Sequence, residues 1–244
     1  VAGDANGMND YLMEEFVSMP VISTFPYTED FELDQGAWIT GGMNSSWEYS
    51  SLLGNIMYED TNMAWVTNAY GPYYQMEHSA IESACFDFTS IANPAISFDM
   101  WTDIPDMEDG LALQYSNDMG WTWHTLGTVY DDDWYSHQYW DEEKGMYDYY
   151  FSGGTGGWVT MTHSLMEIPD LANVKLRFAF GSNEKFEGEG VAIDNISIFE
   201  ETVYPHAFAG IDKEAYSDEK VYLDGSLSTD AYGGSNFTFS WQSL

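Results

Sequence analysis

Basic side chains are almost absent from the first part of this sequence. Its 244 residues include 41 aspartates and glutamates but only six lysines and arginines, and none of the six precedes Lys144. The formal net charge of −35 repels nucleic-acid phosphates and anionic lipid headgroups, so we expect neither nucleic acid nor direct membrane insertion. Screening salt or bound divalent cations must offset the self-repulsion, which favours an extracellular, secreted location. A salt or solubility adaptation and specific cation sites explain the acidic excess equally well.

Cysteine and the common catalytic motifs are also scarce or missing. Cys85 is the single cysteine, so neither an intrachain disulfide nor a cysteine-based metal cluster can form. No run reaches about 18 apolar residues, the length of a membrane-spanning helix. The five histidines form no H-E-x-x-H pair, and the sequence has no nucleophile elbow or phosphate-binding loop. With so many carboxylates, chance pairs are no evidence for a glycosidase. We therefore expect a protein that is not an enzyme.

Strand signals dominate what is present. The sequence is 44% hydrophobic and 17% aromatic, enough for a sizeable core. From Phe25 onward, short apolar runs and turn residues recur roughly every 8 to 15 residues, which is typical of a β-sandwich. The sequence therefore predicts an all-β fold. The predicted strands are Ala64–Asn68, Cys85–Phe88, Ala95–Trp101, Leu111–Tyr115, Trp121–Leu126, Trp158–His163, Val174–Phe180 and Val191–Phe199.

Two of these strands are expected to form a β-hairpin. Leu111–Tyr115 and Trp121–Leu126 show the period-2 pattern of half-buried strands, and the residues between them, Asn117–Gly120, tolerate turn geometry. Trp121 and Trp123 lie on one face of the second strand. We expect that face to pack in the core.

The predicted strand 174–180 and the longer segment 131–157 differ in how their apolar and polar residues are arranged. Val174–Phe180 alternates apolar side chains on one face with Lys175 and Arg177 on the other. Residues 131–157 are acidic and aromatic and end in glycines, and they show no such alternation. We therefore expect a long loop or excursion over 131–157.

Two further segments flank the predicted sandwich. Residues 1–24 are mixed and acidic, and we predict a linker or the tail of a preceding module. The composition changes after Glu201, and residues 202–244 contain two short predicted strands, Val221–Leu223 and Phe237–Trp241. Two strands leave a sandwich half built with open edges, so we expect that the chain continues or that another chain completes it.

Several segments, taken in order, resemble a known family. Residues 25–201 are similar to the jelly-roll surface modules, related to MAM domains, of secreted proteins from gliding, Bacteroidetes-type bacteria. MAM domains proper contain paired cysteines, whereas Cys85 stands alone here. The resemblance implies a jelly-roll β-sandwich. The segments that carry it are Phe25–Tyr27, Asp30–Glu32, Ala64–Thr67, Glu77–Ser83, Phe86–Phe88, the 111–126 hairpin, Val174–Phe180 and Gly188–Ile196.

The C-terminal segment carries a second resemblance. Residues 202–244 resemble the first half of a PKD-type, immunoglobulin-like module through Ala209–Asp212, Val221–Gly225 and Phe239–Trp241. The expected fold class is therefore all-β, a jelly-roll β-sandwich followed by a partial immunoglobulin-like β-sandwich.

Asp30, Glu32 and Asp194 form the acidic set of greatest interest. The first and last strands of a jelly roll are neighbours, so carboxylates on them can converge on one oxygen-lined cation site. The resemblance implies a structural calcium between those strands. Asp194 also interrupts an apolar run, and a buried carboxylate needs a partner. The alternative is a strand-edge carboxylate that accepts hydrogen bonds from backbone amides.

Aromatic and acidic residues are interleaved after residue 130. Aromatic rings can stack on the faces of sugars while neighbouring carboxylates bond their hydroxyls. The same segment can instead form an aromatic cap packed over the sandwich. The candidate carbohydrate-binding residues are Trp134, Tyr135, Tyr139, Trp140 and Asp132.

These observations favour a non-catalytic extracellular module of a large cell-surface or secreted protein. It would act in adhesion or as a calcium-stiffened stalk or filament segment, with surface glycans or neighbouring protein modules as partners. One alternative is a carbohydrate-binding accessory module of a secreted hydrolase. Another is a self-assembling filament protomer, a homo-oligomer in which the C-terminal strands or the Val1–Ile22 arm are added to a neighbouring subunit.

Overall fold

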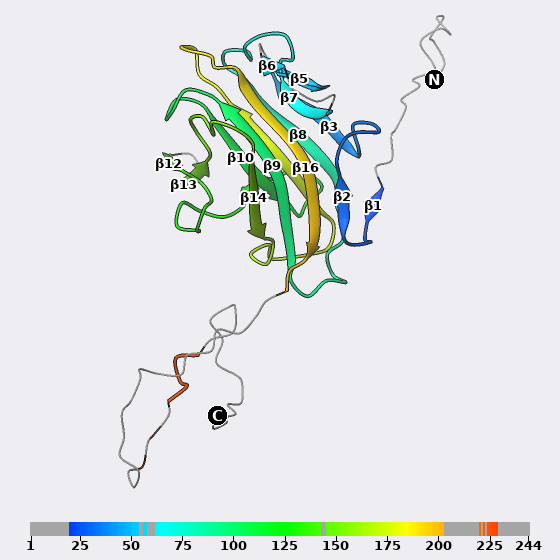
Figure 1. Ribbon diagram of the computed structural model, residues 1–244, viewed down its shortest axis with the longest axis vertical. Helices are drawn as coiled ribbons and strands as arrows, with labels where there is room; N and C mark the ends of the chain where they lie inside the picture. The colour runs from blue at the N-terminus through cyan, green and yellow to red at the C-terminus, as the bar shows by residue number, and fades with distance from the viewer. Residues whose placement is uncertain are drawn as a thin grey trace, which may run out of the picture. The chain divides into compact units, whose positions relative to one another are not determined.

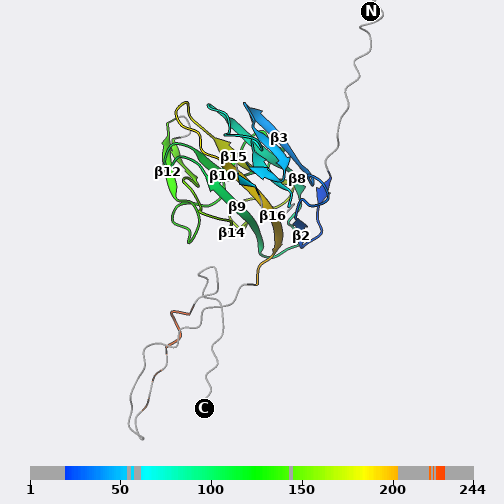
Figure 2. The same ribbon diagram turned by 45° about the horizontal axis from the view of Figure 1, so that its top comes forward.

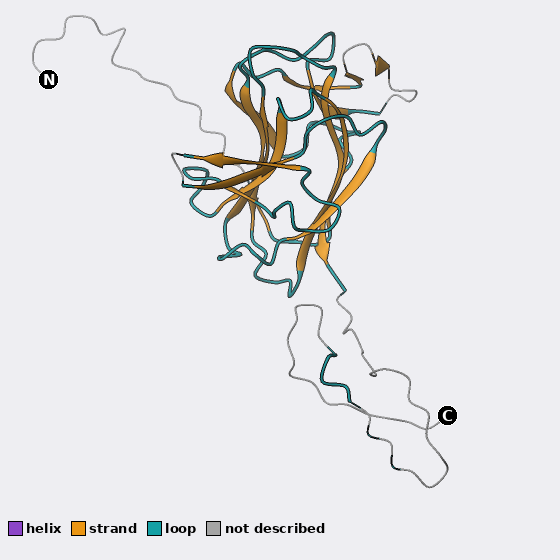
Figure 3. Ribbon diagram, turned by 90° about the vertical axis from the view of Figure 1, so that its left-hand side faces the viewer, coloured by secondary structure: helices purple, strands orange, loops and turns teal. Residues whose placement is uncertain are grey.

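The computed structural model describes residues 20–53, 56–57, 62–142, 145–202, 220, 222 and 224–228. The chain divides into two units, Val1–Phe199 and Glu200–Leu244. No helix occurs in the part of the chain that the structure describes, and the first unit is a jelly-roll β-sandwich (Figure 3). Among these residues, therefore, no helix could cross a membrane. The predicted strands of the PKD-like segment lie, apart from Tyr222, outside the described residues.

The first sheet of the sandwich has six strands. In it β8 pairs with β3 and, in parallel, with β1 (Figure 1). On its other side follow β15, β10 and β11. Because β1 belongs to this sheet, the predicted linker 1–24 already contributes two residues to the sandwich. The strands are β1 (Val21–Ile22), β3 (Trp38–Met43), β8 (His78–Phe86), β15 (Val174–Gly181), β10 (Gly110–Ser116) and β11 (His124–Thr125).

The second sheet also has six strands, in the order β14-β9-β16-β7-β4, with β2 on β16. Ile196 of β16 lies opposite Glu29 of β2, so the first strand of the predicted module is a neighbour of the last, as the jelly-roll topology requires. Two short pairs, β5 with β6 and β12 with β13, complete the described strands. The bounds are β2 (Tyr27–Glu29), β4 (Trp47–Ser50), β5 (Leu52–Leu53), β6 (Ile56–Met57), β7 (Ala64–Thr67), β9 (Pro94–Asp103), β12 (His137–Asp141), β13 (Met146–Tyr150), β14 (Val159–Ser164) and β16 (Gly190–Glu200).

The core lies between the two sheets and is strongly aromatic. Along β15 every second residue is buried, because successive side chains of a strand point to opposite faces. Phe178 of β15 joins the sheets: its ring centroid lies 5.7 Å from that of Trp38 on β3 and 4.7 Å from that of Phe98 on β9. The Phe98–Phe178 pair is edge to face, and such a pair adds about 0.5–1.5 kcal/mol beyond area burial. The single cysteine, Cys85, is buried in this sheet.

The predicted second strand of the hairpin is much shorter than expected. Of the predicted strand Trp121–Leu126, only β11 (His124–Thr125) pairs with β10, because the chain bends through residues 117–123 before it rejoins the sheet. Trp121 is 88% exposed. Trp123 lies on the outer face, where the guanidinium carbon of Arg177 sits 4.2 Å from its ring centroid. The prediction that both tryptophans pack in the core was wrong, since they belong to the bend and not to the ladder.

Two other predicted boundaries differ from the structure. β8 begins at His78, seven residues before the predicted strand, because its first half is rich in polar and small residues and lacks an apolar signal. The predicted excursion 131–157 contains a β-hairpin, β12–β13, which lies beside β10 at one side of the sandwich (Figure 2).

Glu77 is fully buried and ties three strands together. Its carboxylate accepts hydrogen bonds from the Ser46 backbone N–H (2.8 Å), the Ser46 hydroxyl (2.6 Å) and the Ser79 hydroxyl. Its own N–H donates to the Ser182 hydroxyl at 3.0 Å. The side chain therefore links the entry of β4 with the start of β8, and the main chain reaches the segment after β15.

Replacing Glu77 with glutamine is expected to lower the free energy of unfolding by about 1–3 kcal/mol. Glutamine keeps one oxygen that can accept from the Ser46 N–H and the Ser79 hydroxyl, but its NH2 group would face the Ser46 hydroxyl, where the carboxylate accepts, and the charge that strengthens all three bonds is lost. Urea unfolding measures the change. Glu184→Gln, which removes the same charge from an exposed loop, is the matched control and should stay within about 0.5 kcal/mol of the parent. Equal effects of the two substitutions would contradict this role.

Candidate functional site

A cleft of about 500 Å³ lies on the outer face of the first sheet. Its floor is formed by β3, β8, β15 and β10, and its wall by the β12–β13 hairpin. We call it the outer-face cleft. It is the natural candidate for a ligand site because it combines a concave shape with aromatic and polar side chains.

The floor contains a row of four small residues, one from each of four neighbouring strands. Gly41 of β3 lies opposite Ala80 of β8, Ala80 opposite Ala179 of β15, and Ala179 opposite Ala112 of β10. Alternation along each strand turns these residues outward while the bulky residues beside them enter the core. The row leaves room above the sheet, which is why the outer face is hollow there.

The next row of the floor is polar. Glu82 of β8 lies opposite Arg177 of β15, Arg177 opposite Gln114 of β10, and Gln114 opposite Thr125 of β11. Arg177 Nε donates to Gln114 Oε1 at 2.7 Å. Burial, opposed by the charge of Glu82, lowers the pKa of Arg177 to about 10, so it stays protonated at neutral pH. The floor thus offers carboxylate, guanidinium and amide groups side by side.

The hairpin wall supplies three tyrosines, Tyr139, Tyr149 and Tyr150. The chain after β13 is joined to β10 by a bridge in which Leu111 and Phe151 exchange two hydrogen bonds, of 3.0 and 2.8 Å. Tyr139 donates to Asp148 Oδ2 at 3.0 Å, and burial and this carboxylate raise the pKa of Tyr139 to about 12. The tyrosine hydroxyl is therefore neutral and held in place.

Gly110 makes the junction of wall and floor possible. A Cβ atom at this position would lie 2.4 Å from Cδ2 of the Tyr150 ring. Any other residue at this position would force the Tyr150 ring to shift.

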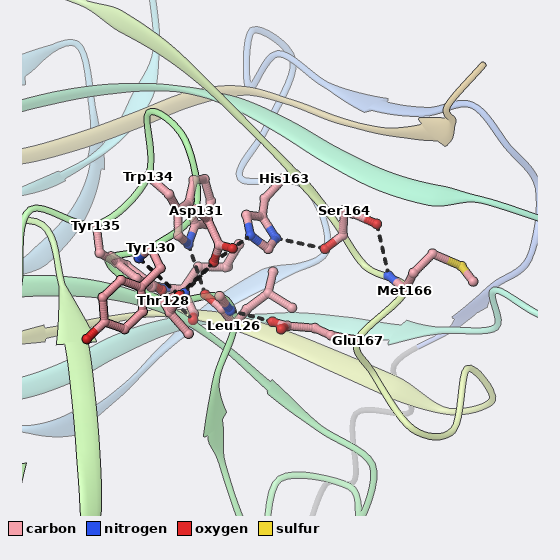
Figure 4. Close-up of polar contacts among 12 residues, drawn as sticks. Leu126, Thr128, Tyr130, Asp131, Trp134, Tyr135, His163, Ser164, Met166 and Glu167 are labelled. Atoms are coloured by element: carbon pink, nitrogen blue, oxygen red, sulfur yellow. Dashed lines mark hydrogen bonds and ion pairs between the residues drawn. The ribbon is translucent and has the colours of Figure 1, made fainter. Parts of the chain in front are cut away.

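Two of the predicted sugar-binding residues form a cap on the core. Trp134 is 6% and Tyr135 4% exposed, and Trp134 Nε1 donates to the Leu126 carbonyl at 3.0 Å (Figure 4). The Trp134 ring also packs on Phe98 and on His163, with centroids 6.0 and 4.5 Å apart. Neither ring presents a face to solvent, so neither can stack on a sugar in this conformation.

Polar contacts fasten the loop that carries Trp134. Asp131 Oδ2 accepts from the Thr128 N–H at 2.6 Å and lies 3.4 Å from His163 Nε2. His163 Nδ1 lies 2.8 Å from the Ser164 carbonyl oxygen, and the Gly127 N–H donates to Glu167 (Figure 4). Asp131, the first residue of this acidic run, thus has a structural role in the loop.

The remaining predicted sugar-binding residues are exposed but separate. Tyr139 lines the outer-face cleft. Trp140, the next residue of β12, points to the other face of the hairpin, where its ring meets Tyr147 edge to face with centroids 5.1 Å apart. Asp132 is exposed in the loop before β12. Of the predicted set, only Tyr139 belongs to the cleft.

The predicted metal residues share a neighbourhood. Burial first, and then the charges of Asp99, Glu32 and Asp30, raise the pKa of Asp194 to about 6. Asp194 is only 3% exposed, and it accepts a hydrogen bond of 2.6 Å from the Asn195 N–H. This backbone contact is the alternative that the sequence left open.

The three carboxylates do not form a ready cation cage. Asp30 Oδ1 accepts from the Glu32 N–H at 3.2 Å, and Glu32 Oε1 accepts from the Met63 N–H at 2.9 Å. Within the described ranges no group of three or more His, Cys, Asp or Glu side chains is arranged to hold a metal ion. Calcium binding at these residues stays a prediction.

Sequence reasoning missed most of the cleft, including Gln114, Tyr149 and Tyr150. One signal pointed to it: Lys175 and Arg177 share the outward face of the 174–180 strand in a chain with few basic residues. The register of four strands, which no sequence pattern supplied, is what joins the floor residues.

No protein-family model and no curated protein sequence matches this chain. Solved structures similar to it include a cleaved adhesin domain of Lys-gingipain from Porphyromonas gingivalis (13% identity, TM-score 0.43, 73% of this chain and 100% of that one). Another is the Caldicellulosiruptor saccharolyticus module CBM27-1 in complex with mannohexaose (14%, 0.41, 72% and 97%). Likeness at this level carries no argument about function.

Replacing Trp134 with alanine is expected to cost about 3–5 kcal/mol of unfolding free energy, because it removes a buried aromatic side chain and leaves a cavity. Urea unfolding tests this. Trp140→Ala, on the exposed face of the hairpin, is the matched control and should cost less than about 1 kcal/mol. A small effect at Trp134 would show that the ring does not belong to the core.

Asp194→Asn is expected to raise the unfolding free energy at pH 7 in EDTA by about 3 kcal/mol. The folded-state pKa of Asp194, about 6, lies above the unfolded value, so its contribution to stability is full below pH 4 and is lost as the pH rises through 6. The variant should lack this pH dependence, and the exposed Asp132→Asn should keep it. Identical pH profiles for parent and Asp194→Asn would contradict the assignment.

The Asp194→Asn variant also tests whether calcium binds near this residue. If calcium binds near Asp194, added Ca²⁺ at pH 7 raises the melting temperature of the parent protein but not of Asp194→Asn. A parent melting temperature equal in Ca²⁺ and in EDTA would rule the site out.

Proposed function

We propose that this protein is a non-catalytic extracellular module that adheres to a polysaccharide, which it binds in the outer-face cleft. The observation that carries the proposal is the meeting of three wall tyrosines with a polar row on the floor. Sugar recognition needs both, since apolar ring faces stack on aromatic side chains while hydroxyls require fixed hydrogen-bonding partners.

The geometry of the floor supports an elongated ligand. The row of small residues from Gly41 to Ala112 crosses four strands, so a chain can lie against the sheet without meeting bulky side chains. The polar row runs parallel to it and ends at Thr125 of β11. Successive sugar units along the cleft would meet Glu82, Arg177 and Gln114 in turn.

Assembly into a filament is a second possibility for regions beyond the cleft. Val21–Ile22 pairs with Cys85–Phe86 of its own chain, so these two residues are already used within the sandwich. Apart from Pro20 and Tyr222, the rest of the N-terminal arm and the C-terminal strands lie outside the described residues. Strand addition between subunits therefore stays a prediction for those segments, as does a calcium-stiffened stalk.

The proposal predicts that Tyr139→Ala weakens polysaccharide binding at least about tenfold, the usual effect of removing an aromatic group from the centre of a binding site. Tyr139→Phe, which keeps the ring, should retain most of the affinity. Affinity electrophoresis against a panel of plant, algal and bacterial polysaccharides, followed by calorimetry on the best ligand, measures the change.

Trp121→Ala is the matched control, because Trp121 is an exposed aromatic residue that does not line the cleft. Its affinity should equal that of the parent protein. If no polysaccharide binds, or if Tyr139→Ala and Trp121→Ala behave alike, the cleft is not a glycan site.

A further inference from the structure

Two of the carboxylates that line the outer-face cleft are paired with lysines. Glu82 Oε2 accepts from Lys175 Nζ at 2.9 Å. Glu108 accepts from Lys185 Nζ through both carboxylate oxygens, at 2.9 and 2.8 Å. Each pair cancels one negative charge at the edge of the cleft, so neither acid needs a cation from a ligand.

The other two carboxylates of the lining are bonded to neutral donors. Asp109 is buried; it accepts from the Asn183 N–H at 2.9 Å and from the Tyr73 hydroxyl. Asp148 accepts from the Tyr139 hydroxyl at 3.0 Å. All four acidic side chains of the lining are therefore bonded within the protein.

The bonding of Arg177 differs from that of these four acidic side chains. Its Nε bonds to Gln114, and its guanidinium lies over the Trp123 ring. Among the described residues no carboxylate oxygen lies within 4.0 Å of it. The neighbouring acid, Glu82, already accepts from Lys175. Arg177 is half-buried, so its charge is partly desolvated, and this burial lowers its pKa.

A desolvated guanidinium without a carboxylate partner is costly, and a bound anion would offset that cost. Its planar fork matches a carboxylate, with two parallel N–H donors facing two oxygens. The Trp123 ring, whose centroid lies 4.2 Å from the guanidinium carbon, covers the group on one side and leaves N–H donors for other acceptors. Arg177 is also the only arginine in the sequence.

We propose that Arg177 is an anion-binding residue of the outer-face cleft, and that the ligand is a polysaccharide containing uronic acids. This inference rests on the proposed function and narrows it to one class of glycan. Because the rest of the chain is strongly acidic, anionic polymers are repelled elsewhere, and a uronate chain binds only where its carboxylate reaches Arg177.

The test compares acidic polysaccharides with neutral forms of the same backbone. Oligogalacturonate and its methyl ester, and glucuronoxylan and unsubstituted xylan, are titrated by calorimetry, with alginate as a third acidic ligand. About 0.15 M NaCl limits the Debye length to about 8 Å, so that general repulsion is screened. We expect at least one acidic polymer to bind at least about tenfold more tightly than its neutral counterpart.

Arg177→Gln should weaken binding of that polymer by about tenfold to a hundredfold, the effect of removing a charge-assisted hydrogen bond, and should abolish the preference over the neutral form. The affinity of Arg177→Lys for the acidic polymer should lie between those of the parent protein and Arg177→Gln, since lysine keeps the charge but lacks the planar pair of N–H donors. Lys220→Gln is the control for net charge, because it removes one positive charge from an exposed position of the other unit. It should bind like the parent protein.

The outcomes separate the two proposals. Binding of neutral glycans with equal or greater affinity, or unchanged uronate binding in Arg177→Gln, overturns the role of Arg177 and leaves the glycan cleft intact. Absence of binding to every glycan overturns both. Should Arg177→Gln fail to fold, the comparison of acidic and esterified ligands on the parent protein still decides the question.

Discussion

The alternation of side chains along β15 determines both the core and the cleft. This strand pairs with β8 on one side and β10 on the other, so its register aligns all three. Its inward residues, such as Phe178, join the two sheets, while the outward ones place Ala179 in the small row and Arg177 in the polar row. A shift by one residue would exchange the two faces and destroy both at once.

Because basic residues are few, three buried carboxylates are hydrogen-bonded to uncharged groups. Glu77, Asp109 and Asp194 are all buried, and in the described structure their recorded partners are backbone amides and hydroxyls. Such donors carry no charge, so they satisfy hydrogen bonds without neutralising the acid. Burial raises the pKa of two of the three, Asp109 and Asp194, although their hydrogen bonds act in the opposite direction. The carboxylates that form ion pairs with lysines are instead Glu82 and Glu108, on the edges of the cleft.

The sequence predicted several long strands well and the site poorly. The strands β9, β10 and β15 were predictable because apolar and polar residues alternate in them, and β16 because it is rich in apolar residues, whereas most of the long strand β8 was missed. The hairpin β12–β13 was not, since it has aromatic residues on both faces and therefore no alternation. The prediction that Trp123 packs in the core was wrong because its two-residue spacing from Trp121 resembles strand alternation. In the structure the Trp123 ring contacts the Arg177 guanidinium. The floor depends on register between distant strands, which local patterns do not encode.

The attachment of the hairpin wall has a consequence for how the fold can diversify. In the described structure β12 and β13 form a sheet of their own, and the Leu111–Phe151 bridge joins the segment after them to the sandwich. Insertions or aromatic substitutions in the hairpin therefore leave the ladder of the main sheets unchanged. The sandwich acts as a constant frame, and the depth and chemistry of its hollow face can be altered by exchanging fewer than twenty residues between Tyr135 and Phe151.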